Sequence, residues 1–177
     1  MGICSRAYSN ALEFSRKLIR NTTATMKNKT KLSASLEDYL EAIYLISEKD
    51  GEARSKGIKE HLQVSGPSVT EALQLLSEKG LVNYAPYESI TLTSQGTKIA
   101  RDVLHRHVTL RDFFIDVLGI DATLADEGAC KMEHVASANI IERMVKYTKY
   151  IQHDCKGQGC DKVNCFDEYL KVEGDQS

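Results

Sequence analysis

Apolar residues recur at helical spacing from about Ser35 onward. The first such run ends at Asp50-Gly51, and Ser35 with Asp38 forms a possible capping box at its start. A shorter run follows through Leu62, and Ser55 is its expected N-cap. The pattern therefore predicts two consecutive helices at the start of the folded region.

A third helix and a hairpin complete this first module. Ser65 is the expected N-cap of the third helix, Pro67 is tolerated in its first turn, and Gly80 is the expected C-cap. Residues 81–84 and 89–93 then have the composition of two short strands. Helix, helix, turn, helix and hairpin in this order predict a winged helix-turn-helix.

The second half of the chain has helical periodicity and no predicted sheet. A long helix starts at Ser94 and stops at Gly119, and another begins at Asp121 or Thr123. A last helix is expected over about 137–151. The fold class is therefore mostly α, with an N-terminal winged helix-turn-helix domain followed by an all-helical domain.

These elements divide the chain into four parts. We expect the winged helix-turn-helix over residues 33–95, the helical domain over 96–152, and a cysteine-containing tail over 153–177. Residues 1–32 form an extension with seven Lys or Arg against Glu13 alone, a net charge of +6, so the rest carries −8 of the total of −2. An acidic body needs the basic extension or bound cations before it approaches phosphates closely.

Composition narrows the cellular setting. No apolar run approaches the roughly 20 residues that cross a bilayer, and the N-terminus lacks an apolar signal-peptide core. A cytoplasmic location without membrane contact is therefore expected. The five cysteines are an odd number, and in a reducing compartment they are more typical of thiols or metal ligands than of disulfides.

The predicted helix-turn-helix is a candidate DNA-reading module. Such a module inserts the first turns of its second helix, here the third predicted helix, into the major groove. Small hydroxyl residues there contact phosphates or bases, and Pro67 suits a thymine methyl. Winged helices also bind proteins, so a protein-interaction module with a structural metal is the alternative interpretation. The candidate DNA-binding residues are Ser65, Pro67, Ser68, Thr70, Glu71 and Gln74.

Two groups of residues have the chemistry of metal ligands. Cys130, Glu133 and His134 lie at i, i+3 and i+4, which places them on one face of the predicted helix. Thiolate, carboxylate and imidazole together suit a divalent transition metal better than calcium or magnesium. Asp38 and Glu41 share a face of the first helix in the same way. An enzyme is not expected, because no nucleophile–base pair or substrate-pocket motif accompanies these ligands.

The tail contains three evenly spaced cysteines, Cys155, Cys160 and Cys165. One interpretation is a second metal or redox site. The other is a tail that carries free thiols, because the spacing is not the paired C-x-x-C of ordinary zinc sites.

Four motifs resemble the iron- and manganese-dependent repressors of the diphtheria-toxin-repressor and manganese-transport-regulator family. They are residues 36–44 (LEDYLEAIY), 64–70 (VSGPSVT), 92–96 (LTSQG), and Arg106-His107 followed by 130–137 (CKMEHVAS). Together they cover about residues 33–152 in the family's order. The resemblance implies a winged-helix domain joined to a helical dimerisation domain. It also implies a homodimeric, metal-activated repressor of metal-uptake genes that binds double-stranded operator DNA.

Carried over by position, the resemblance implies a set of metal ligands. Cys130 matches the iron branch, where the manganese branch has glutamate, whereas Asp38 replaces a methionine of the iron branch, so this chain mixes the two. Arg111 and Asp126 stand where the iron branch has the glutamate and histidine of an ancillary site. The implied ligands are Asp38, Glu41, His107, Cys130, Glu133 and His134.

Donor chemistry indicates which metals to expect. A thiolate favours softer or later metals, whereas carboxylates and imidazole tolerate Mn²⁺ and Fe²⁺. We therefore expect Fe²⁺ or Mn²⁺, with Co²⁺ or Ni²⁺ able to replace them in vitro. A metal with ligands from both domains would restrict their relative motion and raise DNA affinity.

Overall fold

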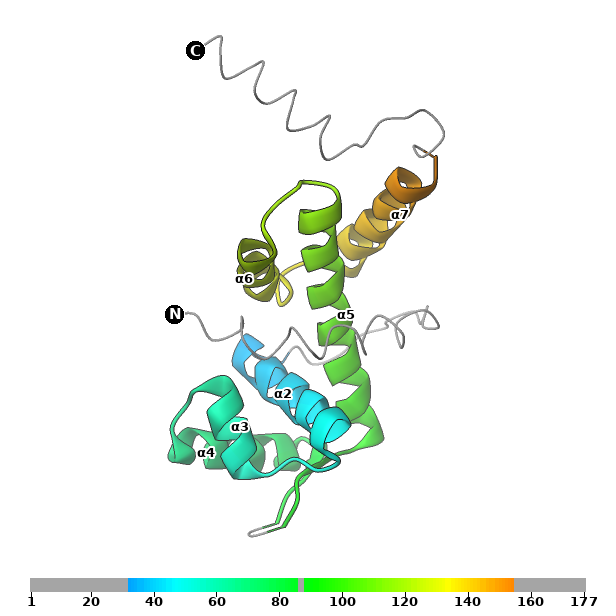
Figure 1. The fold of residues 1–177 in the computed structure, drawn as a ribbon. Helices are drawn as coiled ribbons and strands as arrows, with labels where there is room; N and C mark the ends of the chain where they lie inside the picture. Colours follow the sequence, from blue (N-terminus) through cyan, green and yellow to red (C-terminus); the bar gives the residue numbers. More distant parts are fainter. Residues whose placement is uncertain (1–31, 86–87, 155–177) are drawn as a thin grey trace. The chain divides into compact units, whose positions relative to one another are not determined.

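The computed structural model describes residues 32–85 and 88–154 of the 177-residue chain (Figure 1). The chain divides into two compact units, one up to His105 and one from Arg106, and the division falls within helix α5 (Ser94–Asp116). Among the described residues, no helix combines the length and apolar character that a membrane span requires.

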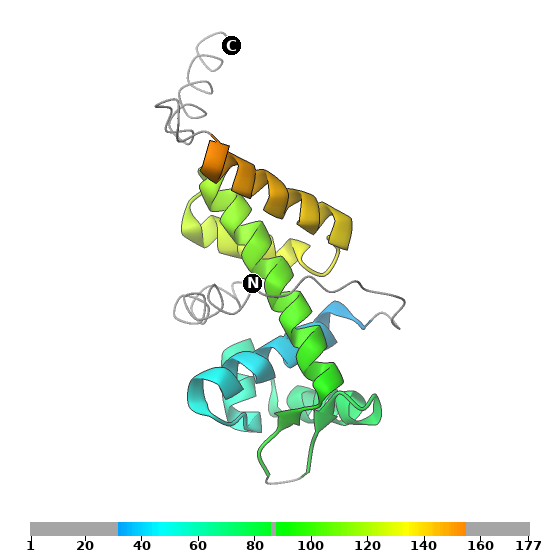
Figure 2. The same ribbon diagram turned by 90° about the vertical axis from the view of Figure 1, so that its right-hand side faces the viewer.

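The described residues of the first unit form three helices and a hairpin, and the part of α5 before the division follows them (Figures 1 and 2). Helix α2 packs against α3, α4 and β2, and its Leu40 and Ile43 side chains are fully buried. This order of elements confirms the predicted winged helix-turn-helix. The bounds are α2 Ala34–Asp50, α3 Ser55–Leu62, α4 Gly66–Glu78, β1 Val82–Asn83 and β2 Thr91–Leu92.

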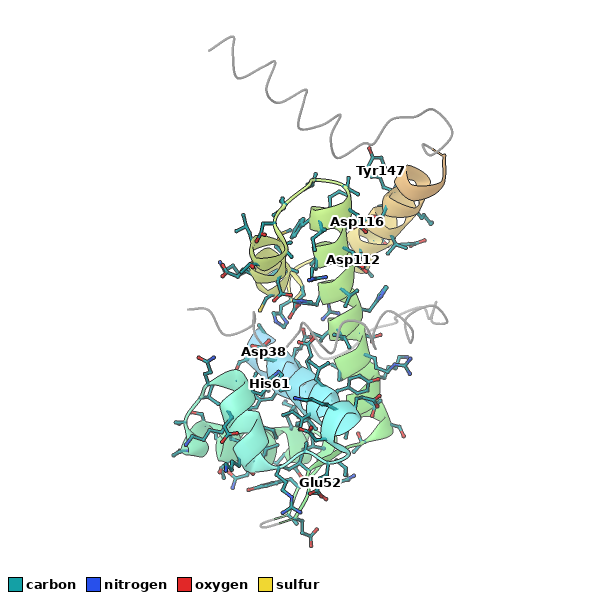
Figure 3. All side chains as sticks on the ribbon, in the orientation of Figure 1. Asp38, Glu52, His61, Asp112, Asp116 and Tyr147 are labelled. Carbon is teal, nitrogen blue, oxygen red and sulfur yellow. The ribbon has the colours of Figure 1, made fainter. Side chains whose placement is uncertain are left out.

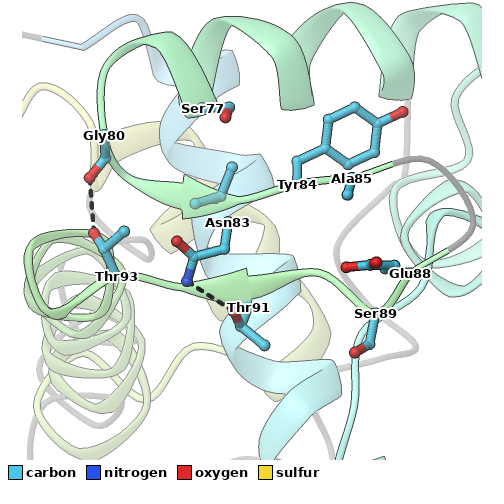
Figure 4. A pocket seen from close by; sticks show the side chains of 10 residues that line it. Ser77, Gly80, Asn83, Tyr84, Ala85, Glu88, Ser89, Thr91 and Thr93 are labelled. Carbon is cyan, nitrogen blue, oxygen red and sulfur yellow. Dashed lines mark hydrogen bonds between the residues drawn. The ribbon is translucent and has the colours of Figure 1, made fainter.

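The hairpin is shorter than the two predicted strands. Its strands are antiparallel, with Val82 opposite Leu92 and Asn83 opposite Thr91. Across the second pair, the Asn83 side-chain amide donates to Thr91 Oγ1 at 3.0 Å (Figure 4). The regular pairing ends there, so only the base of the predicted hairpin forms a ladder among the described residues.

Thr93 fastens the base of the hairpin to the helices on either side. Its hydroxyl donates to the Gly80 carbonyl at 2.8 Å (Figure 4). The same oxygen accepts the Gly96 amide at 3.1 Å, which satisfies one of the free N–H groups in the first turn of α5. One side chain therefore connects the segment after α4, the hairpin and the start of α5.

Two helix starts differ from the prediction. The N-cap of α2 is Ser33 rather than Ser35, because the Ser33 hydroxyl accepts the Leu36 amide at 3.4 Å. Ser55 is the first residue of α3 and does not cap it; Arg54 precedes it without a side-chain hydrogen bond to the helix. In both places the serine expected to be the N-cap lies one or two residues after the actual N-cap.

The helix ends and the other cap agree more closely with the pattern. Ser65 caps α4 as predicted, with its oxygen 3.2 Å from the Ser68 amide. Helix α4 ends one residue earlier than expected: Lys79 is its C-cap, and Gly80 follows with φ of 67°, the left-handed conformation that glycine adopts at low cost. Asp121 caps α6, which resolves the alternative of Thr123.

The described residues of the second unit are built from the end of α5 together with α6 (Ala122–Met132) and α7 (Ala138–Asp154). One residue from each helix, Leu110, Ala129 and Ile141, forms its buried core. Phe114 and Met144 pack against these three. This core confirms the all-helical second domain.

Gly96 is a position where the fold excludes any side chain. A Cβ atom there would overlap the carbonyl oxygen of Leu81. We expect Gly96→Ala to lower the free energy of unfolding by about 1–3 kcal/mol, because backbone must shift to make room. Urea unfolding of the full chain followed by circular dichroism measures this.

Gly57→Ala is the matched control, since its Cβ would lie 3.9 Å from Ile46, an ordinary contact. A helix-interior alanine should leave stability unchanged or raise it by up to about 1 kcal/mol. If Gly96→Ala were as stable as Gly57→Ala, the close approach of Leu81 to α5 would be wrong.

Candidate metal centre

Glu133 is the centre of a buried polar cluster in the second unit. Its side chain is only 1% exposed, and Oε2 lies 2.6 Å from Nδ1 of His107, which α5 contributes. Its other oxygen, Oε1, lies 3.2 Å from Nε2 of His134. His107 is fully buried. The structure thus brings three of the predicted ligands together around one carboxylate.

The backbone around Glu133 corrects one detail of the sequence analysis. Helix α6 ends at Met132, so the predicted helical face does not continue through His134. Glu133 keeps helical backbone angles and donates its amide to the Ala129 carbonyl at 2.9 Å. The chain then turns, because the Val135 amide bonds to the Met132 carbonyl at 3.1 Å. His134 therefore reaches Glu133 from this turn.

Cys130 lies one turn before Glu133, and the helical angles of Glu133 place the two residues on the same side of α6. Its side chain is partly buried, and the cysteine is not part of a disulfide. Thiolate, carboxylate and two imidazoles form a donor set that suits a divalent transition metal. The chemistry of the residues present therefore fits the metal that the resemblance implies.

Asp126 is a buried carboxylate that the sequence analysis did not connect to this cluster. It is 4% exposed, and Oδ1 lies 3.1 Å from Nε2 of His107 and 3.4 Å from Nε of Arg111. Helical spacing carried a signal: Arg111 follows His107 by four residues on α5, and Asp126 precedes Cys130 by four on α6. What the spacing could not give was the packing of one helix face against the other.

Charge within the cluster is unevenly balanced. The Asp126 carboxylate faces the permanently charged guanidinium of Arg111. The Glu133 carboxylate instead contacts two imidazoles, which are neutral unless protonated. A buried carboxylate is costly without a compensating positive charge. The surroundings of Glu133 therefore favour a bound cation.

The two remaining predicted ligands belong to α2 in the first unit. Glu41 is 3% exposed, and Asp38 is partly buried three residues before it on the same helix (Figure 3). Burial raises the pKa of Tyr39 above its ordinary value, and the carboxylates of Asp38 and then Glu71 raise it further. A predicted metal ligand and a predicted DNA-binding residue thus act electrostatically on the same phenol.

The predicted DNA-binding residues occupy the first turns of α4, and all six are exposed. Some of their hydroxyls already make local bonds: the Ser65 and Ser68 oxygens lie 2.7 Å apart, and Thr70 Oγ1 donates to the Gly66 carbonyl at 3.2 Å. Glu71 and Gln74 point from the next turn, so the exposed face combines hydroxyl, carboxylate and amide groups. The cysteines at 155, 160 and 165 lie outside the described residues.

Comparison with known proteins agrees with both units. Residues 31–90 match the N-terminal DNA binding domain of the iron dependent repressors. Residues 93–159 match the metal binding and dimerisation domain of the same repressors. The two matches follow each other in the order that the sequence motifs indicated.

Individual relatives show the same likeness. An uncharacterized HTH-type transcriptional regulator of Methanocaldococcus jannaschii is 40% identical over 114 residues, which are 64% of this chain and 91% of the relative. The HTH-type transcriptional regulator MntR of Bacillus subtilis is 35% identical over 120 residues, 68% of this chain and 84% of that protein.

A solved structure extends the likeness to three dimensions. A manganese-dependent transcriptional repressor in complex with manganese superposes with a TM-score of 0.60 at 27% identity over 65% of this chain. The match spans about half, 53%, of that solved chain. On the evidence of its two units and of both domain matches, the chain belongs to the iron-dependent repressor family of metal-dependent, DNA-binding transcriptional repressors.

Proposed function

We propose that this repressor is activated by Fe²⁺ or Mn²⁺ and that metal binding raises its affinity for operator DNA upstream of metal-uptake genes. Co²⁺ and Ni²⁺ replace the activating metal in vitro, and the protein acts in the cytoplasm. The observation that carries the proposal is the buried convergence of His107, Glu133 and His134. Together with Cys130, they offer soft and hard donors to one ion.

We assign Asp38 and Glu41 to the same ligand set. The resemblance supports this assignment, as does the near-complete burial of the Glu41 carboxylate, which is unusual for an acidic residue that has no role. A metal that takes ligands from both units restricts their relative motion. The metal-free protein loses conformational entropy when it binds DNA, and bound metal removes part of this loss in advance. The resulting coupling free energy between metal binding and DNA binding is roughly 1–3 kcal/mol.

A second contribution to the coupling is electrostatic. The carboxylates of Asp38 on α2 and Glu71 on the recognition helix α4 both raise the pKa of Tyr39, so two negative charges act on one phenol. An ion bound at Asp38 neutralises part of this charge. Phosphates then approach α4 with less repulsion, and the remaining DNA contacts come from its exposed hydroxyl and amide groups.

The homodimer is proposed to form through apolar groups of the second unit. Ile140 and Tyr147 lie seven residues apart on one face of α7 and are 53% and 48% exposed. The Tyr147 ring lies against Phe113 of α5, with ring centroids 6.4 Å apart. Val135, in the turn before α7, is a further apolar residue that is 75% exposed. Burial of such groups against a second copy is favourable.

Metal dependence of DNA binding tests the central proposal. For a duplex selected from a random library in the presence of Mn²⁺, we expect affinity at fixed salt to rise roughly 5–150-fold on adding metal. Glu133→Ala should abolish the rise, because it removes the carboxylate around which the imidazoles gather. Fluorescence anisotropy with Mn²⁺ and with a chelator measures both.

Glu127→Ala removes a neighbouring carboxylate of α6 and serves as the matched control, which should keep the metal response. Equal binding of the wild type with metal and with chelator would refute metal activation. A full response in Glu133→Ala would instead remove this residue from the ligand set.

Cys130 is expected to set the preference between metals. Replacing its thiolate by a carboxylate in Cys130→Glu should raise the ratio of Mn²⁺ to Fe²⁺ affinity several-fold, because carboxylate suits the harder ion. Competition with a chromophoric chelator under anaerobic conditions measures both affinities. Cys130→Ala, which adds no donor, should weaken both metals; unchanged affinities in both variants would show that Cys130 is not a ligand.

Ile140→Asp should shift the protein from dimer to monomer in sedimentation equilibrium, because it places a charge on the proposed dimer surface. Asn139→Asp adds the same charge at the neighbouring exposed position and should leave the dimer intact. A dimer that withstands Ile140→Asp would place the contact elsewhere.

A further inference from the structure

His107 is engaged at both ring nitrogens inside the second unit. Nδ1 faces Glu133 Oε2 at 2.6 Å, and Nε2 faces Asp126 Oδ1 at 3.1 Å. A neutral imidazole has one N–H and one lone pair, so the two nitrogens have different roles. Because the ring is fully buried, water does not compete for either nitrogen. The partner of Nε2 therefore decides which nitrogen has a lone pair for a metal.

Arg111 determines what Asp126 offers to His107. The same oxygen, Oδ1, is 3.4 Å from the Arg111 Nε, and the arginine side chain is only 15% exposed. A guanidinium carries donors and no acceptor. A carboxylate oxygen has only lone pairs, so Oδ1 acts as an acceptor toward the imidazole nitrogen, while its approach to Arg111 Nε is an ion pair. Asp126 Oδ1 thus favours the His107 tautomer that carries its hydrogen on Nε2.

When a cation is bound to the Glu133 carboxylate, this tautomer turns the Nδ1 lone pair toward that cation. Without a cation, the 2.6 Å contact between Nδ1 and Glu133 Oε2 requires a hydrogen between the two atoms. A metal held by the Glu133 carboxylate then finds a nitrogen donor already oriented toward it, with little reorganisation of the ring. The opposite tautomer would direct a lone pair at the Asp126 carboxylate and a hydrogen at the metal. Its cost is both the repulsion at Asp126 and the loss of one ligand.

We propose that Asp126 is a positioning residue for metal binding, which accepts the His107 Nε2 hydrogen and presents Nδ1 as a ligand, while Arg111 holds the Asp126 carboxylate in place. This inference rests on the proposed function, because it takes His107 and Glu133 as ligands. It gives Arg111 and Asp126 a role in the affinity of this centre, in place of direct contact with an ion.

Zinc affinity of the full chain provides the first readout. Zn²⁺ competition with a chromophoric chelator should show a 10–100-fold loss in Asp126→Ala, as for other groups that orient a ligand. Asp126→Asn keeps an oxygen that Arg111 turns toward His107, so it should retain most of the affinity. Glu127→Ala, which removes a charge from the next residue, should match the wild type.

The tautomer provides a second readout that a purely structural role would not change. The chain has five histidines, and ¹⁵N-histidine labelling with a His107→Gln variant identifies the His107 signals. In the Zn²⁺-bound wild type, we expect the hydrogen on Nε2 and slow exchange of it with water. Asp126→Ala should lose this slow exchange, and Asp126→Asn should restore it.

Each outcome supports or overturns the proposal. A Zn²⁺-bound wild-type His107 with its hydrogen on Nδ1 overturns it, and this result needs no variant to fold. Unchanged zinc affinity in a folded Asp126→Ala, checked by circular dichroism, also overturns it while leaving the proposed function intact, provided that Glu133→Ala weakens zinc. If Glu133→Ala binds zinc as the wild type does, the proposed metal centre itself fails and the positioning role fails with it.

Discussion

The burial of the Glu133 carboxylate is the constraint on which the second unit depends. A carboxylate that is 1% exposed must be compensated by partners that approach it closely, or the unit loses several kcal/mol. His107 and His134 supply these contacts from two different elements, so α5 and the turn after α6 have to meet at this point. A buried carboxylate destabilises an ordinary core, but a cation bound to it offsets this cost. Folding of the unit is therefore linked to binding of its ligand.

Much of the fold follows from hydrophobic period alone. The faces of α2, α4 and α5 are set by the spacing of large apolar side chains, and the hairpin follows from β-branched residues between turn signals. The helix starts were less accurate because period does not determine them. Ser33 and Ser35 are chemically equivalent as caps, and only the backbone, extended at Ser33, selects between them. Similarly, the chain turns after Met132, where the Val135 amide bonds to the carbonyl three residues before it, and residue spacing does not reveal this turn.

Residue type and spacing predict one part of the candidate centre. The part that depends on packing between helices is not predicted in full. Cys130, Glu133 and His134 draw attention because three ligand-grade residues lie within five positions. His107 entered the set through resemblance, since a single histidine on a long helix carries little signal. Asp126 was noticed only as a departure from the iron branch. Its contact with His107 arises when α5 and α6 pack together, and no pattern along one helix contains that information.

Thr93 has a consequence for how the DNA-binding unit comes apart. Its hydroxyl joins the Gly80 carbonyl to the first turn of α5, and Gly96 lies against Leu81 with no room for a methyl group. Fraying of that turn therefore also breaks the hydrogen bond to Gly80, just before β1. The base of the β1–β2 hairpin and the start of α5 then open together, as one cooperative unit. The wing is thus not an independent flap, and groove contacts made by its strands would protect amides in α5 from hydrogen exchange.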